Sequence, residues 1–351
     1  MPGALNQLRS LPKVEFHRHL DGSVRFETIV ELARDHKIDL GIDPGLADFK
    51  QKLLCRVKIT QPMHSLQEVL DSFWTTQKVQ CSRQAMERIA YENVEDCFLD
   101  GVRLAELRFA PVFIAKDKSY LAYKDIIQGV IDGVERACQD FAIEVGLIHI
   151  LPRSLSLAEN IRATEEVFNI KKSSYPGAWR LVGIDLADNE QGTNAQDFVE
   201  IIAKAKDQGL SVTIHSGEDT SAEHVRRSIE LYSPKRIGHG IKVWGNESVM
   251  DLLLKKGIHL EVCPTSNWLT HCVTSLQDHP LAKLYRAGIS LSINSDDPRL
   301  MNIDLTNEYR VCRDYLGLDM DCFRRINLEA LDHSFLPKQK IESIKSKYFT
   351  A

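Results

Sequence analysis

The chain has 351 residues, of which 43% are hydrophobic and 26% are charged, and its 44 basic and 49 acidic side chains give a formal net charge of −5. This balance argues against an intrinsically disordered chain and against a nucleic-acid binder, which would carry a basic patch. We expect no membrane contact, because no stretch approaches the roughly 18 apolar residues that span a bilayer. The eight cysteines include no C-x-x-C pair and the N-terminus has no signal-peptide pattern, which predicts a reducing, cytoplasmic location.

Short runs rich in β-branched residues recur along the chain, and longer segments with helical spacing of apolar residues separate most of them. Segments 123–141, 195–208 and 219–231 are examples of the helical spacing. This alternation predicts the α/β class with a parallel sheet, and eight strands favour a single-domain (β/α)8 TIM barrel over residues 1–351. A doubly wound open sheet is the competing architecture. The predicted strands are residues 13–20, 101–110, 143–151, 181–187, 210–217, 236–241, 258–264 and 289–296.

The interval between the first two predicted strands is the longest. Residues 38–100 predict a helical insertion, which includes a helix over 65–77, and an insertion after the first strand would lie over the barrel mouth, where barrel enzymes keep their active sites. Residues 303–349 predict further C-terminal helices that close the bottom or the side of the barrel.

Histidine and aspartate side chains lie at the ends of four predicted strands. Strand periodicity puts His17 and His19 on one face of the first strand. His215 ends the fifth strand, His239 lies near the end of the sixth, and Asp296 ends the eighth. Because the carboxyl ends of the strands meet on one face of a barrel, three imidazoles and one carboxylate there suit Zn²⁺ with room for a water. Each cluster alone also fits a core histidine or an ordinary turn, so the prediction rests on their conjunction.

The fourth strand contains no lysine that could be carboxylated to bridge two metals, which favours one metal ion. Six motifs occur in order between residues 14 and 298: VEFHRHLDGS, DLADNE, HSGED, RIGHGI, EVCPTSN and SINSDDP. Together they resemble the adenosine and adenine deaminase branch of the amidohydrolase superfamily. The resemblance implies a zinc-dependent (β/α)8 barrel that hydrolyses the 6-amino group of a purine and releases ammonia.

The resemblance implies roles for residues at the predicted metal site. His17, His19, His215 and Asp296 would hold one zinc ion. The zinc ion would lower the pKa of a bound water, and the hydroxide that results would attack C6 of the purine. His239 would orient this hydroxide and stabilise the developing charge.

Further roles concern the purine and the ribose. Glu218 resembles the family's proton shuttle to N1, which needs a carboxyl of raised pKa, and Asp297 would hydrogen-bond N7. Asp21, in the LDG form typical of nucleoside deaminases, would contact the ribose 5′-hydroxyl, and His19 is counted with it among the substrate-binding residues. The LDG and RIGHG forms both favour adenosine over adenine.

Asp188 departs from the pattern of the family. Adenosine deaminases usually have DLAGDE on the fourth strand, and the glycine N–H contacts purine N3. The N–H of Asp188 can still do so, and aspartate tolerates a left-handed backbone better than most residues. Its side chain, however, adds bulk and charge. We therefore expect either an altered substrate or a carboxylate turned toward a ribose hydroxyl.

The predicted helix over 65–77 carries Leu66, Val69, Leu70 and Phe73 on one face. This spacing also fits ordinary core packing. The resemblance implies a helix here that covers the purine with apolar side chains, so the four residues are candidate substrate contacts.

The predicted function is zinc-dependent deamination of adenosine and 2′-deoxyadenosine to inosine and 2′-deoxyinosine, with a purine nucleoside as the only predicted partner and a monomer or weak homodimer as the assembly. Alternatives are deamination of adenine or of a modified adenosine: 5′-methylthioadenosine, N6-methyl-AMP or aminodeoxyfutalosine. A non-deaminating metal hydrolase and a non-catalytic purine-binding protein are further alternatives. The remaining histidines, His279 among them, receive no predicted role.

Overall fold

The computed structural model describes residues 2–63, 72–192 and 194–349. Its strands are β1 (Lys13–His19), β2 (Val102–Phe109), β3 (Glu144–Pro152), β4 (Leu181–Ala187), β5 (Ser211–Ser216), β6 (Arg236–His239), β7 (His259–Val262) and β8 (Leu291–Ile293). They form one sheet in chain order with every neighbouring pair parallel. Beyond the end of β8, the amide of His19 donates to the carbonyl of Asp296 and the amide of Asp296 to the carbonyl of His17, each at 2.8 Å. These bonds join β1 to β8, so the predicted barrel is confirmed and the open sheet is wrong.

The last three strands are shorter than predicted, for reasons visible in the backbone. β6 stops where His239 and Gly240 take left-handed conformations, with φ of 57° and 68°. After β8, Asp296 likewise has a φ of 61°. β7 stops ahead of Pro264, whose ring nitrogen carries no hydrogen for a strand ladder. The left-handed residues break the strand alternation at the mouth of the barrel.

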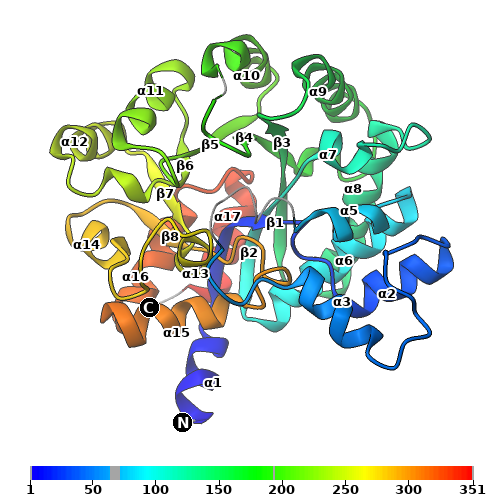
Figure 1. The fold of residues 1–351 in the computed structure, drawn as a ribbon. Helices are drawn as coiled ribbons and strands as arrows, with labels where there is room; N and C mark the ends of the chain where they lie inside the picture. The colour runs from blue at the N-terminus through cyan, green and yellow to red at the C-terminus, as the bar shows by residue number, and fades with distance from the viewer. Residues whose placement is uncertain (1, 64–71, 193, 350–351) are drawn as a thin grey trace.

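Helices surround the strands in Figure 1, which looks along the barrel. The segment 123–141 forms one helix as predicted, whereas 195–208 divides into a 3-10 turn and a helix. The segment 219–231 becomes helical only after Ser221, whose hydroxyl accepts the amide hydrogen of His224 as an N-cap. The helices are α1 (Pro2–Ser10), α2 (Phe26–Asp35), α3 (Phe49–Val57), α5 (Trp74–Val79), α6 (Arg83–Leu99), α7 (Pro111–Ala115), α8 (Tyr123–Asp140), α9 (Leu157–Lys172), η1 (Ala178–Arg180), η2 (Ala195–Phe198), α10 (Val199–Asp207), α11 (Ala222–Tyr232), η3 (Ile241–Val243), α12 (Glu247–Lys256), α13 (Pro264–Leu269), α14 (Leu281–Arg286), α15 (Leu305–Leu316), α16 (Met320–Leu331) and α17 (Lys338–Tyr348).

The long interval between β1 and β2 contains α2, α3, α5 and α6. Of these, α6 packs along α8 and against β2, so the end of the segment 38–100 belongs to the outer ring of the barrel. The contact is close because of two glycines on α8. A Cβ at Gly129 would lie 2.4 Å from the carbonyl oxygen of Arg83, and one at Gly133 would lie 2.2 Å from that of Glu87.

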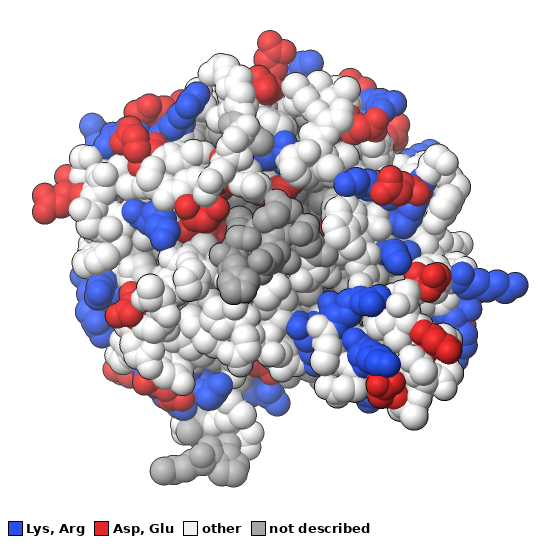
Figure 2. Space-filling view, viewed as in Figure 1, with Lys and Arg blue, Asp and Glu red and all other residues white. Residues whose placement is uncertain are grey.

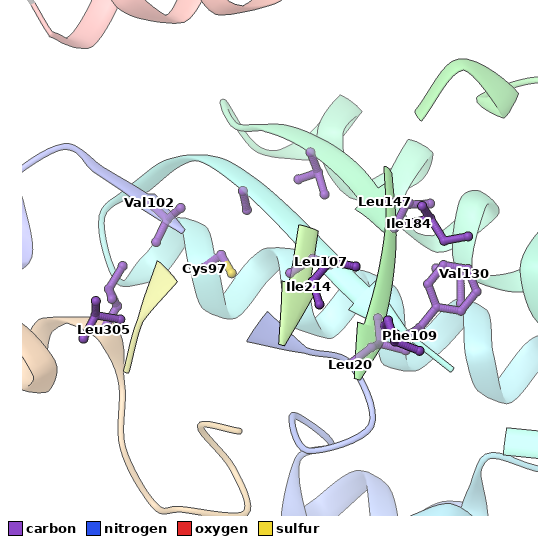
Figure 3. Close-up of a cluster of buried hydrophobic side chains, with 14 of the residues drawn as sticks. Leu20, Cys97, Val102, Leu107, Phe109, Val130, Leu147, Ile184, Ile214 and Leu305 are labelled. Atoms are coloured by element: carbon purple, nitrogen blue, oxygen red, sulfur yellow. The ribbon is translucent and has the colours of Figure 1, made fainter. Parts of the chain in front are cut away.

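The largest apolar core lies between the strands and the ring of helices (Figure 3). The apolar strand residues of this core are each at most 2% exposed. Figure 3 labels Leu107, Phe109, Leu147, Ile184 and Ile214 from the strands, with Cys97, Val130 and Leu305 from the helices.

The interior of the barrel contains a network of buried charged groups, beside an apolar cluster toward the closed end. Arg108 donates to Asp185 Oδ2 at 2.7 Å and to Glu261 Oε2 at 2.6 Å. Arg236 donates to Glu261 Oε1 at 2.6 Å and to Glu106 Oε2 at 2.7 Å. All five side chains are fully buried. The network therefore crosses the barrel from β2 to β4, β6 and β7.

The predicted C-terminal helices close the end of the barrel opposite the strand carboxyl ends. Phe335 lies in the segment between α16 and α17. Its ring centroid is 3.5 Å from Cζ of the Arg236 guanidinium. The amide of Phe335 and the hydroxyl of Ser334 donate to Glu106 Oε1 at 2.6 and 2.7 Å.

In the view of Figure 2, Lys and Arg side chains are interspersed with Asp and Glu around the rim. No helix among the described residues has the length and apolar character needed to cross a membrane.

Candidate active site

Three imidazoles and one carboxylate converge at the carboxyl ends of β1, β5 and β8. His19 Nε2 lies 3.4 Å from His17 Nε2 and 3.3 Å from His215 Nε2. Asp296 Oδ1 lies 3.4 Å from His17 Nε2 and 3.3 Å from His19 Nε2. Ligand atoms of a tetrahedral zinc ion are themselves about 3.3–3.6 Å apart. The four residues that the sequence singled out therefore lie together at a spacing that suits a metal ion.

The outer nitrogens of two imidazoles show which atoms face the centre of this cluster. His17 Nδ1 lies 2.8 Å from Glu261 Oε2, and His215 Nδ1 lies 2.9 Å from Asp185 Oδ2. Burial opposes ionisation of Glu261, but Arg108 and Arg236 hold its pKa well below the ordinary value. The carboxylates accept hydrogen from Nδ1, so both Nε2 lone pairs point inward at each other, an arrangement that a bound cation stabilises.

Glu218 lies beside the cluster and is buried. Its Oε2 lies 3.4 Å from His239 Nε2, and its Oε1 accepts from Thr270 Oγ1 at 3.1 Å. Burial, followed by the charges of Asp296 and Glu190, raises the pKa of Glu218 well above its ordinary value. Glu190 also fixes the turn, because its carboxylate accepts the amide hydrogens of residues 217 and 218 at 2.8 and 2.9 Å. The surroundings of Glu218 thus favour the protonated form of its carboxyl.

Asp297 and Asp21 are two further acidic residues on the pocket wall. Burial, followed by the charges of Asp296 and Asp21, raises the pKa of Asp297 well above its ordinary value. Burial also raises the pKa of Asp21 to about 7. Among the described residues, Oδ1 of each has no hydrogen-bond partner. Gly22 makes room for this arrangement, since a Cβ there would lie 1.9 Å from Asp297 Oδ1.

A pocket of about 390 Å³ opens above these side chains, within the range of small-molecule sites. Its apolar lining includes Phe73, Trp74, Phe113 and Met301, and the histidines and carboxyls also line it. The predicted helix over 65–77 is described only from residue 72 onward, where α5 begins at Trp74. Of the four predicted apolar contacts, Phe73 lines the pocket, and Leu66, Val69 and Leu70 lie outside the described residues.

Asp188 lines the same pocket with a left-handed backbone, φ 78°. Its Oδ2 accepts from the amide of Ser154 at 3.2 Å and also from the Ser154 hydroxyl. Its Oδ1 accepts from the amide of Asn189 at 2.7 Å. The carboxylate therefore binds the loop after β3.

The family model described as adenosine deaminase matches residues 12–350. An adenosine deaminase of Yersinia pseudotuberculosis serotype I (strain IP32953) is 34% identical over 339 residues, covering 97% of this chain and 98% of that protein. An adenosine deaminase of Serratia proteamaculans (strain 568) is 34% identical, with coverage of 96% and 98%. This chain belongs to the adenosine deaminase family.

Solved structures of deaminases share the fold of this member of the adenosine deaminase family. The Arabidopsis N6-mAMP deaminase has a TM-score of 0.83 at 26% identity, covering 99% of this chain and 100% of that one. The adenine deaminase of Arthrobacter aurescens has a TM-score of 0.86 at 23% identity, with coverage of 96% and 98%. An amidohydrolase from Burkholderia ambifaria with bound Zn has a TM-score of 0.85 at 20% identity, with coverage of 99% and 92%.

Several residues that shape this family member's site received no role from its sequence. Asp185 and Glu261 orient the imidazoles, and Glu190 fixes the turn that carries the buried acid. All three lie in the motifs DLADNE and EVCPTSN, and strand alternation could have signalled the inward direction of Asp185 and Glu261. Asn267, which ends the motif EVCPTSN, contacts His279 beside His239, and His279 had the weaker signal because it lies outside every motif.

Proposed function

We propose that the protein is a zinc-dependent deaminase that converts adenosine and 2′-deoxyadenosine to inosine and 2′-deoxyinosine with release of ammonia. Its membership of the adenosine deaminase family supports this reaction. The observation that carries the proposal is the juxtaposition of the metal-binding cluster with a buried acid of raised pKa, Glu218, in one pocket.

One zinc ion is proposed at the cluster, held by His17, His19, His215 and Asp296. Imidazole nitrogens and carboxylate oxygens are ligand types of catalytic zinc sites. When bound, zinc supplies Lewis-acid activation of a water molecule as the nucleophile. Asp296 also faces the pocket and can accept a hydrogen bond from that water.

Glu218 is proposed as the general acid. Its carboxyl donates a proton to purine N1 as the nucleophile adds to C6, so the negative charge that develops on the ring is neutralised. The resulting carboxylate can accept a proton from the attacking water and return it to the 6-amino group, which then leaves as ammonia. The proton of the hydroxyl left on C6 passes back to Glu218, which yields the 6-keto product and restores the acid. His239, 3.4 Å from Glu218 Oε2, stabilises the oxygen that adds to C6.

Asp297 and Asp21 are proposed to recognise the nucleoside. N7 of a neutral purine only accepts hydrogen bonds, so Asp297 must hold a proton, in keeping with its raised pKa. Asp21 is proposed to bind the ribose 5′-hydroxyl, with His19 beside it. A carboxylate at this place disfavours a 5′-phosphate, which argues for a nucleoside rather than a nucleotide.

Lys116 supports a second candidate, a deaminase of N6-methyl-AMP. It is the only Lys or Arg among the described residues that line the pocket, and its ammonium group could pair with a phosphate. Its Nζ lies 4.3 Å from the centroid of the Trp74 ring. An ADAL–IMP complex has a TM-score of 0.83 to this chain at 27% identity, with coverage of 98% of both chains.

The experiment incubates zinc-loaded protein with adenosine, adenine and N6-methyl-AMP in parallel and follows the ultraviolet spectrum of each. Rapid loss of the adenosine spectrum with little change in the other two supports the proposal. Preferential turnover of adenine or of the nucleotide would contradict the proposed substrate and the role of Asp21. Absence of turnover on all three would contradict deamination of these purines.

A further inference from the structure

A chain of buried hydrogen bonds connects the start of α14 with the mouth of the barrel. The amide of Leu281 donates to His279 Nδ1 at 3.1 Å. His279 Nε2 lies 3.2 Å from Asn267 Oδ1, and Asn267 Nδ2 lies 3.0 Å from His239 Nδ1. His279, Asn267 and His239 are each at most 1% exposed, so water does not compete for these groups.

The first member of this chain determines the direction of every bond that follows. A backbone N–H can only donate, so His279 Nδ1 must be the unprotonated nitrogen of its ring. His279 therefore carries its proton on Nε2 and donates to Asn267 Oδ1. The other end of the Asn267 amide is then its NH₂ group, which can only donate. His239 Nδ1 must accept this bond, and the proton of His239 is on Nε2.

The structure thus assigns a position to the proton of His239 that matters for the site. His239 Nε2 faces Glu218 Oε2 at 3.4 Å and Asp296 Oδ2 at 3.9 Å. A nitrogen that carries hydrogen donates to such oxygens and has no lone pair for a metal ion. By distance alone, a ring nitrogen of His239 is close enough to His17 and His215 to share a metal with them. The direction of these hydrogen bonds argues against His239 as a metal ligand.

We propose that Asn267 and His279 are positioning residues that hold His239 as its Nε2–H tautomer, so that it donates a hydrogen bond to the oxygen that adds to the substrate. This inference deepens the proposed function and rests on it for the identity of that oxygen. The tautomer itself is a property of the protein without substrate. Burial lowers the pKa of His279 to about 3, so the chain keeps its direction throughout the neutral pH range.

Histidine-labelled, zinc-loaded protein tests the tautomer by ¹⁵N NMR, with the His239→Gln variant identifying the signals of His239. We expect a pyridine-type Nδ1 and a pyrrole-type Nε2. A pyrrole-type Nδ1 in the unmodified protein would overturn the proposal, whatever the variants do. Lack of turnover on every purine, together with the expected spectrum, would count against the proposed function and leave the tautomer assignment standing.

Asn267→Asp tests the positioning role with nearly unchanged shape. A carboxylate only accepts, so it should draw the proton of His239 to Nδ1 and invert the tautomer. We expect kcat to fall by at least about 10²-fold, because a wrong tautomer in a serine protease triad costs about 10⁴-fold. KM should change far less. Loss of kcat with the tautomer unchanged, or an inverted tautomer with full kcat, would overturn the proposal.

His279 provides a rescue experiment. His279→Leu removes the donor to Asn267, whereas His279→Gln can supply an amide hydrogen in its place, so the Gln variant should retain more of both the Nε2–H signature and kcat. The control is His149→Leu, which removes an equally buried histidine whose Nε2 contacts Thr164 Oγ1 at 2.9 Å on the other side of the barrel wall. It should lower stability and leave the tautomer unchanged. Equal loss of the tautomer in all three variants would reduce the chain to a structural feature and overturn the proposal.

Discussion

Glu218 combines burial with a hydrogen-bond donor, Thr270, that fixes its carboxyl in the pocket. Glu218→Gln keeps the shape and removes the transferable proton. We expect zinc content to stay unchanged and kcat to fall by about 10²–10⁴-fold, the usual contribution of a general acid. Metal analysis and steady-state kinetics measure the two effects, and Glu223→Gln on the exposed side of α11 is a control for the loss of a carboxylate. Full turnover by Glu218→Gln would remove the residue from its proposed role.

The same residue predicts the pH dependence of the reaction. The pKa of Glu218 is raised, and only its protonated form can donate to N1. Turnover should therefore be retained at neutral pH and should decline as pH rises through the raised pKa. Profiles of kcat against pH between neutral and alkaline conditions measure this decline. A kcat that increases steadily over that range would show that the ionised form of the acid is the active one.

Asp188 places a charged group on the pocket wall where the family usually has glycine. Because its carboxylate is held by Ser154, the charge stays in place and should repel anionic substrates. Asp188→Gly is expected to shift the ratio of kcat/KM for N6-methyl-AMP to that for adenosine by roughly three- to tenfold toward the nucleotide, as a charge interaction of about 1 kcal/mol implies. Asp188→Asn separates loss of charge from loss of the contact with Ser154. An unchanged ratio in both variants would contradict this role.

At the scale of the elements, the order of strands and helices was predictable because hydrophobic periodicity reports which face of each segment is buried. The ends of the strands were less predictable. His239 and Asp296 have positive φ, which is uncommon in residues that are not glycine. That His17 and His19 lie on the same face of β1 followed from the two-residue period of side chains along a strand. The contact of His279 with Asn267 did not, since a hydrogen bond between a loop residue and a residue of α13 depends on their three-dimensional arrangement.

The packing of α6 on α8 provides a prediction about one interface. Ala usually stabilises a helix relative to Gly, but a Cβ at Gly133 would lie 2.2 Å from the carbonyl oxygen of Glu87. Gly133→Ala should therefore lower the free energy of unfolding by about 1–3 kcal/mol without changing zinc content. Lys124→Ala, at an exposed position on α8, is the control and should change stability by less than about 0.5 kcal/mol. Denaturant unfolding compares the variants, and a stabilised Gly133→Ala would show that the helices can separate at no cost.

At the scale of the molecule, ion pairs inside the barrel extend from its closed end to its mouth. Arg236 connects Glu106, beside the C-terminal segment, with Glu261, which in turn orients His17. Arg108 connects the same glutamate with Asp185. Sequence alternation predicts which of these side chains point inward, but the pairing of two arginines among three carboxylates is defined only when the sheet closes. This is why the sequence could place the proposed metal ligands at one end of the barrel, whereas the pairing of the carboxylates that orient them depends on the closed fold.

Glu308 provides a prediction about the stability of the whole chain, because it lies in α15, buried away from the pocket, with Oε2 accepting the amide hydrogen of Thr265 at 2.8 Å. Burial raises its pKa from 4.5 to about 8. Between these values the folded protein binds a proton at Glu308 that the unfolded chain has lost, so stability should fall as pH rises. Below pH 4.5 the group is protonated in both states, and above about 8 it is ionised in both.

Glu308→Gln removes this titration and keeps an oxygen for the amide of Thr265. We expect the free energy of unfolding of the unmodified protein, minus that of the variant, to fall by about 1.4 kcal/mol per pH unit between pH values of about 5.5 and 7.5. The difference cancels contributions that the two proteins share, such as the pH dependence of zinc binding. Urea unfolding of the zinc-loaded proteins measures it, with Glu342→Gln on the exposed face of α17 as the control. A difference independent of pH would show that Glu308 is ionised in the folded protein, compensated by a cation or water that reaches its carboxyl.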